Sequence, residues 1–199
     1  MISNRQLFLR HVAQTSDAPL MLEIEKAEGV YLFDVSGKKY LDLISGISVS
    51  NIGHRHPAVL AAIRHQLDRY MHLMVYGEYV QSPQVQLASA LSHNLPPSLN
   101  SVYFLNSGAE VTEAAMKLAK RISGKSEIIA CYHSYHGSTQ GALSLNSDEY
   151  FKNAFRPLLP DIRFIRFNNE EDLTLITEKT ACIFIEPVQG EAGYLPAKK

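Results

Sequence analysis

Residues 102–122 read VYFLNSGAEVTEAAMKLAKRI, and this stretch decides the fold. An apolar run at 102–105 is followed by a segment, 111–122, in which apolar residues recur at helical spacing. Ser107 lies between them and is a good N-cap residue, and Glu110, three positions later, completes a capping box. The stretch therefore predicts a strand, a short turn and a capped helix.

The turn before this helix is a place where an α/β protein can hold a phosphate. The first backbone N–H groups of a helix have no partner within it and lie at the positive end of its dipole. Gly108, between Ser107 and Ala109, allows a ligand to approach the backbone closely. A capped helix that binds nothing explains these residues equally well, so the rest of the chain has to distinguish the two interpretations.

Composition describes an ordinary globular protein with one substantial core and a small appended subdomain. The chain has 199 residues, of which 46% are hydrophobic and 20% charged. Its 19 basic and 20 acidic residues give no electrostatic basis for binding nucleic acid or a membrane. No signal peptide or membrane span is recognisable, and Cys131 and Cys182 lie in apolar runs typical of reduced core cysteines. We expect a cytoplasmic protein.

The first part of the chain predicts a small antiparallel meander. A short helix is expected within 3–15, and two further helices follow, at 57–70 and 83–95. Between the first and second helices, short strand-like runs are separated by Glu-Gly and Ser-Gly turns. These runs are 21–26, 30–34 and 40–43.

Beyond residue 97, apolar runs alternate with helical patterns. The expected strands are 102–105, 128–132, 162–167 and 181–185, and the expected helices are 107–122, 139–145 and 170–177. Runs that are apolar throughout indicate strands covered on both faces, as in a mostly parallel sheet. The predicted fold class is α/β, with an N-terminal segment of a small domain at 1–55 and the first part of a large, mostly parallel domain at 56–199.

Polar residues follow three of the predicted strands at their carboxyl ends, where ligands bind in such sheets. The clusters occupy 106–109, 133–137 and 186–191. They combine a phosphate-type turn, an aromatic side chain, Tyr135, that can cover a ring face, and two carboxylates, Glu186 and Glu191. Together they predict a pocket for a flat, phosphorylated ligand.

Through these residues and the motifs around them, the sequence resembles the N-terminal half of a class III aminotransferase. This is a family of pyridoxal-phosphate enzymes with the fold-type-I architecture. Four blocks in family order carry the resemblance across nearly the whole chain. They are YLFDVSGKKYLD with GHRHP (31–42 and 53–57), NSGAE with EAA and KLA (106–110, 113–115 and 117–119), YHGST (135–139) and IEPVQGEAG (185–193).

The resemblance implies specific roles for these residues. Ser107, Gly108 and Ala109 would bind the cofactor phosphate, and Tyr135 would stack on the pyridine ring. The cofactor site would also include His136, Glu186 and Gln189. The implied substrate positions are Ile47, Ser138 and Glu191, the last matching a carboxylate that pairs with a substrate-binding arginine in some members. No metal is implied.

Family members continue past the last block to an aspartate for the pyridinium nitrogen, the Schiff-base lysine and an arginine for the substrate carboxylate. None of these motifs is present here, and Lys198 and Lys199 stand in the wrong context for a Schiff-base lysine. We therefore expect a truncated chain that is inactive alone. The complete enzyme is expected to be a homodimer with its active site between subunits, and to transfer an amino group from an amine or amino acid to a 2-oxo acid.

Two positions bear on the amino donor. Members that act on ornithine or its acylated forms usually have arginine where this chain has Ser138, and serine cannot form the bidentate contact with a carboxylate. An aromatic residue of ornithine-specific members is matched by Ile47. Both differences argue against an ornithine-type donor, and neither identifies a different amino donor.

Two alternatives belong to other functional classes. His54, His56, His133 and His136, with Cys131 nearby, could supply ligands for a metal-dependent hydrolase, although no glutamate completes a known ligand pattern. A non-catalytic interaction module derived from the aminotransferase fold is the other. A nicotinamide-binding domain is disfavoured because no Gly-x-Gly-x-x-Gly follows a strand.

Overall fold

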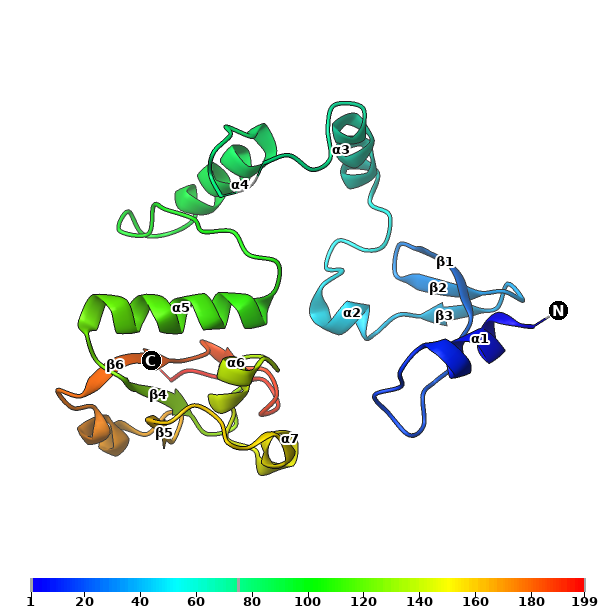
Figure 1. The fold of residues 1–199 in the computed structure, drawn as a ribbon. Helices are drawn as coiled ribbons and strands as arrows, with labels where there is room; N and C mark the ends of the chain where they lie inside the picture. The colour runs from blue at the N-terminus through cyan, green and yellow to red at the C-terminus, as the bar shows by residue number, and fades with distance from the viewer. Residues whose placement is uncertain (1, 75, 199) are drawn as a thin grey trace. The chain divides into compact units, whose positions relative to one another are not determined.

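The computed structural model describes residues 2–74 and 76–198 (Figure 1). The chain forms two compact units, residues 1–82 and 83–199, which we call the N-terminal and C-terminal units. The predicted division at residues 55 and 56 concerns the domains of a larger protein, and it stays a prediction.

The N-terminal unit contains the predicted antiparallel meander. Its sheet has the order β1-β2-β3, with Glu28 opposite Tyr31 in one hairpin and Tyr31 opposite Leu41 in the next. The first hairpin turns at Gly29, which has a positive φ of 57°. The elements of this unit are α1 (Asn4–His11), β1 (Ile24–Glu28), β2 (Tyr31–Asp34), β3 (Lys39–Leu41), α2 (Ser45–Ser48) and α3 (Pro57–Leu67).

The segment after the meander is irregular and apolar. Ser45, Ile47 and Ser48 all have positive φ, so α2 is a strained turn rather than a regular helix. Leu43 and Ile47 are 84% and 79% exposed, and none of the described residues in 2–74 and 76–82 is fully buried. This unit therefore leaves a large apolar surface uncovered.

The C-terminal unit contains the predicted parallel sheet, in the order β5-β4-β6 with both strand pairs parallel. Helix α5 lies along one face of this sheet (Figure 1). Helix α4 begins at the last residue of the N-terminal unit and otherwise belongs to the C-terminal unit. The elements are α4 (Ser82–His93), α5 (Gly108–Ser123), β4 (Glu127–Cys131), α6 (Gln140–Ser144), α7 (Glu149–Lys152), η1 (Asn153–Phe155), β5 (Ile162–Ile165), η2 (Glu170–Leu175), β6 (Thr180–Phe184), β7 (Val188–Gln189) and β8 (Leu195–Pro196).

The core is built on the two faces of the central strand β4. Successive side chains of a strand point to opposite faces. Ile128 and Ala130 accordingly pack with Met116 of α5 and Leu145, while Ile129 and Cys131 pack with Ile165 on the other face. The expectation from the continuous apolar runs, a strand covered on both sides, is confirmed for β4. Cys131 and Cys182 are free thiols, as expected.

Three local expectations are wrong. Residues 102–105 form no strand, because no described segment pairs with their backbone, and an apolar run needs a neighbouring ladder to become a strand. The predicted helix at 170–177 is the 3-10 helix η2, Glu170–Leu175. The helix beginning at Pro57 ends at Leu67, before Tyr70.

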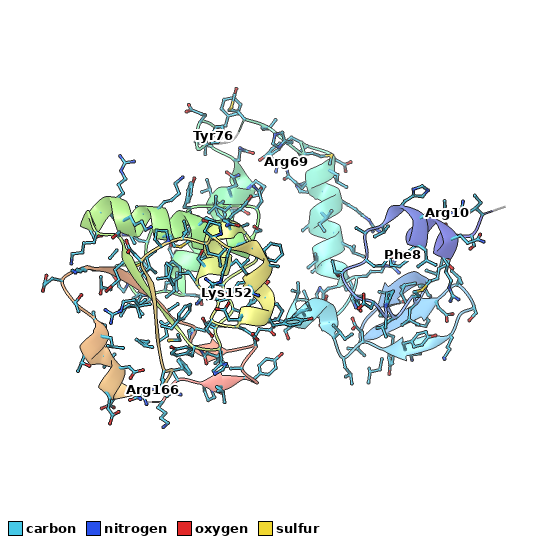
Figure 2. All side chains as sticks on the ribbon, turned by 60° about the horizontal axis from the view of Figure 1, so that its bottom comes forward. Phe8, Arg10, Arg69, Tyr76, Lys152 and Arg166 are labelled. Carbon is cyan, nitrogen blue, oxygen red and sulfur yellow. The ribbon has the colours of Figure 1, made fainter. Side chains whose placement is uncertain are left out.

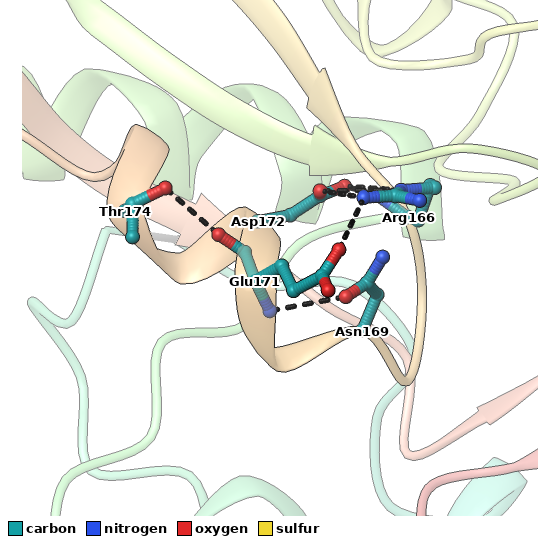
Figure 3. A network of polar contacts seen from close by, with 5 residues as sticks. All are labelled: Arg166, Asn169, Glu171, Asp172 and Thr174. Carbon is teal, nitrogen blue, oxygen red and sulfur yellow. Dashed lines mark hydrogen bonds and ion pairs between the residues drawn. The ribbon is translucent and has the colours of Figure 1, made fainter.

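Polar side-chain contacts hold the peripheral segments of the C-terminal unit in place. The Arg166 guanidinium forms two-pronged contacts with Asp172, the shortest at 2.6 Å, and lies 3.5 Å from Glu171, which fastens η2 to the end of β5 (Figure 3). Lys152 on α7, labelled in Figure 2, is buried. Its ammonium lies 3.6 Å from Glu149 and over the ring of Phe164. Among the described residues, no helix combines the length and apolar character that crossing a bilayer requires.

Candidate cofactor site

The N-terminus of α5 is capped as the sequence predicts, with one difference. Ser107 has extended backbone and its hydroxyl accepts the Glu110 N–H at 3.2 Å. The Glu110 carboxylate reaches back to the N–H of Asn106 at 2.7 Å, one residue before the cap, so the reciprocal bond of the predicted capping box is displaced. Within the described residues, the backbone N–H groups of Gly108 and Ala109 have no acceptor.

A cleft of about 650 Å³ opens beside these two N–H groups. One wall is the first turn of α5 and the other is the loop 135–139 that follows β4. The cleft lies at the carboxyl end of a parallel strand, where ligands bind in α/β sheets. Its lining residues are Gly108, Ala109, Thr112, Tyr135, His136, Gly137, Ser138 and Thr139.

Gly137 brings the two walls together. Its φ is 129°, and a Cβ atom placed on it would lie 2.8 Å from the Cβ of Ala109 and 2.9 Å from its Cα. No side chain fits at that separation, so the loop can pack this closely on α5 only with glycine here. A Cβ on Gly108 would instead meet nothing within 4 Å, which leaves the helix N-terminus open toward a ligand.

Tyr135 is the aromatic side chain of the cleft, and it is held at both ends. Its backbone N–H donates to Glu186 at 3.2 Å, and its hydroxyl pairs with the Ser138 hydroxyl at 2.9 Å. The other Glu186 oxygen lies 3.5 Å from the Gly190 N–H, so this carboxylate ties the loops that follow β4 and β6 together. Tyr135 as a whole remains 45% exposed, which leaves surface for stacking.

His136, the next residue of the loop, is partly buried. Its ring packs edge-on against Phe184, with centroids 5.7 Å apart, and its buried Nε2 has no hydrogen-bond partner among the described residues. Burial lowers the pKa of His136 below 6.5, and the charge of Glu186 opposes part of that change. The imidazole is therefore neutral at physiological pH, with a polar atom that lacks a partner.

The remaining predicted site residues lie elsewhere. Gln189 is 1% exposed, donates to the Tyr132 carbonyl at 2.9 Å and lines a second cavity of about 300 Å³. Glu191 is exposed at the surface of the C-terminal unit. Ile47 belongs to the N-terminal unit, in the strained turn described above.

The structure adds residues to the site that sequence reasoning missed. Thr112 and Thr139 line the cleft, and Glu113 and Asn146 bind its loop through polar contacts. Thr112 lies four positions after Gly108 on the same helix face, which could have indicated it. No local pattern marks Asn146, because its partners lie nine and ten residues away in the chain.

The histidines that suggested a hydrolase are used differently. His54 Nε2 lies 2.7 Å from the Asp42 carboxylate, a contact that fastens its loop to the end of β3. Hydrogen bonding from the Ser45 N–H and from His54 lowers the pKa of Asp42. Over residues 2–74 and 76–198, no three His, Cys, Asp or Glu side chains gather as a metal site would require.

The cleft has the features that pyridoxal phosphate requires. Two free N–H groups and a hydroxyl at a helix N-terminus suit a phosphate dianion, and the open Cβ position of Gly108 leaves room for it. The partly exposed Tyr135 suits a flat ring, and the partnerless Nε2 of His136 offers a further polar contact. The residues present therefore fit this group.

Fold and cleft together define an α/β protein with a candidate site for a phosphorylated ring at the carboxyl end of its parallel sheet. The family model described as aminotransferase class-III matches residues 12–199. The chain belongs to this family, whose members use pyridoxal phosphate.

Among curated relatives, an acetylornithine aminotransferase from Archaeoglobus fulgidus is 39% identical over 191 residues, which are 96% of this chain and 50% of the relative. A [LysW]-aminoadipate semialdehyde/glutamate semialdehyde transaminase from Sulfolobus acidocaldarius is 37% identical over 177 residues, 88% of this chain and 45% of the relative. The chain spans about half the length of the curated relatives it matches.

Solved structures show the same relation. An adenosylmethionine-8-amino-7-oxononanoate aminotransferase from Methanocaldococcus jannaschii matches with a TM-score of 0.90 and 29% identity, covering 98% of this chain and 49% of that one. A taurine:2-oxoglutarate aminotransferase from Bifidobacterium kashiwanohense, solved in complex with PLP and glutamate, matches with a TM-score of 0.82 and 27% identity, covering 96% and 49%.

Proposed function

We propose that this chain forms the cofactor-binding part of an aminotransferase that moves an amino group from an amine or amino acid to a 2-oxo acid. The observation that carries the proposal is the joint lining of one cleft by the uncapped N–H groups of α5 and by Tyr135. A phosphate site next to an aromatic platform is what pyridoxal phosphate needs, and membership of the family supports this ligand over other phosphorylated rings.

In this proposal the chain binds and orients the cofactor. Ser107, Gly108 and Ala109 bind the phosphate through a hydroxyl and backbone N–H groups. Tyr135 covers one face of the ring, and Glu186 fixes the backbone of that residue. Neutral His136 offers Nε2 toward the cofactor, while Gln189, on β7, supports the segment after β4 through its bond to the Tyr132 carbonyl.

When bound, pyridoxal phosphate supplies an electron sink for negative charge developed at the substrate carbon. The residues of the cleft exclude water from one face of the ring and set its orientation. We propose that the lysine that carries the cofactor lies outside these 199 residues, so that this chain alone does not catalyse transfer. An amino-transfer assay of the 199-residue chain beside the natural gene product tests this, and turnover by the short chain would contradict it.

The donor is proposed from Ser138 and Ile47. The relatives named acetylornithine aminotransferases favour an ornithine-type donor, whereas Ser138 lacks the guanidinium that would bind its carboxylate. The missing guanidinium at Ser138 leads us to propose that N-acetylornithine is a poor donor. Glu191 of the C-terminal unit and Ile47 of the N-terminal unit are each proposed as substrate-binding residues in their own unit. Comparing N-acetylornithine with other amino donors, in the wild type and in Ser138→Arg, tests this directly; efficient use of N-acetylornithine by the wild type would contradict it.

The cofactor assignment is tested by binding. In the natural gene product, Ser107→Asp should weaken binding of pyridoxal phosphate by placing a carboxylate against the phosphate. Helix stability should change little, because aspartate is also an N-cap. Ser3→Asp, which alters the serine N-cap of α1, is the matched control and should bind the cofactor like wild type.

Pyridoxal, which lacks the phosphate, separates the phosphate contribution from the ring contribution. Its affinity should be low and should be the same in wild type and Ser107→Asp. Unchanged affinity of Ser107→Asp for pyridoxal phosphate would contradict the proposal that the cofactor phosphate binds at Ser107. A fall in thermal stability with intact affinity would instead restore the interpretation of Ser107 as a cap alone.

A further inference from the structure

We infer that Glu113 and Asn146 are positioning residues. They are not part of the cleft lining, and they determine where Tyr135 and Gly137 lie relative to the phosphate-binding end of α5. This inference rests on the proposed function. Neither residue touches the cleft, and both act through the loop 135–139. Glu113 binds this loop from α5, and Asn146 binds it from the segment after α6.

Glu113 fastens one end of the loop to α5. One of its carboxylate oxygens accepts three hydrogen bonds, from the Thr139 hydroxyl at 2.6 Å, the Gly141 N–H at 2.8 Å and the Ala142 N–H at 3.1 Å. The two N–H groups are in the first turn of α6, so Glu113 satisfies donors that this short helix leaves free. A side chain on Gly141 would meet the Glu113 carboxylate, which shows how closely the two elements approach.

Asn146 fastens the middle of the loop. It is 2% exposed, and its side-chain oxygen accepts the His136 N–H at 2.9 Å while its nitrogen donates to the Gly137 carbonyl at 3.1 Å. The His136 N–H belongs to the peptide group that joins Tyr135 to His136, and the Gly137 carbonyl belongs to the one that joins Gly137 to Ser138, so the amide fixes the orientation of both. These two peptide groups flank the segment that contains the glycine packed against Ala109.

The position of the loop determines the width of the cleft. Gly137 touches Ala109, whose N–H is one of the two proposed phosphate donors, and Tyr135 is two residues earlier in the same loop. Thr112 adds a bond from α5 to the His136 carbonyl at 2.9 Å, but Thr112 also lines the cleft, so a variant of it cannot report on positioning alone. Loss of the Glu113 or Asn146 side chain should let the loop move away from α5 without changing the identity of any residue that lines the cleft.

The test compares two glutamates in the natural gene product. Glu113→Ala removes the acceptor of the Thr139 hydroxyl. Glu127→Ala, the matched control, removes an acceptor of the Thr180 hydroxyl at 2.7 Å, at the opposite end of β4 from the cleft. Asn146→Leu removes both amide bonds at similar volume, and Glu113→Gln keeps an acceptor oxygen.

The readouts are affinity for pyridoxal phosphate, visible circular dichroism of the bound cofactor, which reports its orientation, and thermal stability. Glu113→Ala and Asn146→Leu should each bind about tenfold more weakly, the loss expected from one or two buried hydrogen bonds, with altered dichroism. Glu113→Gln should recover most of the affinity. Glu127→Ala should lose stability and keep wild-type affinity and dichroism.

Wild-type affinity and dichroism in both Glu113→Ala and Asn146→Leu would overturn the positioning role. So would an equal loss of affinity in Glu127→Ala, because the effect would then follow stability. If the wild-type protein itself binds no pyridoxal phosphate, the proposed function fails, an outcome distinct from failure of the positioning role.

Discussion

Gly137 is the residue at which the geometry of the cleft is most sensitive to substitution. Gly137→Ala places a Cβ 2.8 Å from Ala109 at a φ of 129°. We expect a loss of roughly 1–3 kcal/mol in stability from the forced separation of loop and helix, together with weaker binding of pyridoxal phosphate. Thermal unfolding and cofactor titration measure the two effects.

Gly193→Ala is the control for this prediction. Gly193 also has a positive φ, 96°, but a Cβ there meets nothing within 4 Å. This variant should lose stability through backbone strain alone and keep its cofactor affinity. Equal affinity in Gly137→Ala and Gly193→Ala would mean that the contact with Ala109 does not shape the site.

Asp34 gives a prediction about acid stability. Hydrogen bonds, the strongest from the Ser36 side chain, lower the pKa of Asp34 from 3.8 to about 2. The pKa of Asp34 is lower in the folded state than its ordinary value. The stabilisation from these hydrogen bonds is therefore complete above pH 3.8 and is lost as the pH falls toward about 2. Asp34→Asn should therefore be less stable than wild type near neutral pH, and the difference should shrink as the solution is acidified.

Thermal unfolding of wild type and Asp34→Asn across that pH range measures this. Asp17→Asn is the comparison, since no hydrogen bond to the Asp17 side chain occurs in the described part of the chain. Near neutral pH, Asp17→Asn should lose less stability than Asp34→Asn, because it removes no hydrogen bond. A stability difference for Asp34→Asn that stays constant down to strong acid would contradict the assigned hydrogen bonds.

At the scale of elements, helix α5 forms one wall of the cleft. The contribution of its C-cap residue to the stability of the protein can be measured separately. Gly124 is its C-cap, in the left-handed region with φ 69°, and its N–H donates to the Lys120 carbonyl. Gly124→Ala should cost about 1 kcal/mol of stability from conformation alone, because its Cβ would meet nothing within 4 Å. Gly124→Asn should lose less, since asparagine tolerates this region better; equal losses would contradict the explanation.

The elements differ in how well the sequence predicts them, for a physical reason. Helix α5 is predictable because its cap, its apolar stripe and its terminal glycine are all local. The meander is predictable because its turns are marked by glycine. Residues 102–105 carry an equally clear apolar run, yet they form no strand, since strand formation depends on a partner that the local sequence cannot specify.

The same distinction applies to the site. Gly108, Ala109 and Tyr135 lie in motifs at the ends of predicted elements, and the structure brings them to one cleft, which Ser107 adjoins as the N-cap residue of α5. Glu113 and Asn146 could not be predicted, because each acts through partners at least nine residues away that only the fold brings close.

For the whole molecule, the N-terminal unit gives a prediction about assembly. Leu43, Ile44, Ile47, Val49 and Ile52 are all more than half exposed within ten residues of sequence. A surface of this kind is unusual on a monomer, and we propose that a second copy of the protein covers it in a homodimer. Light scattering of the natural gene product should give the dimer mass, and a stable monomer at micromolar concentration would contradict the proposal.

The central claim is the location of the cofactor phosphate, and a crystal structure of the natural gene product with pyridoxal phosphate bound tests it most directly. We predict phosphate oxygens within about 2.7–3.2 Å of the backbone nitrogens of Gly108 and Ala109, with the ring against Tyr135. A phosphate bound elsewhere, such as in the smaller cavity beside Arg166 and His133, would contradict the account.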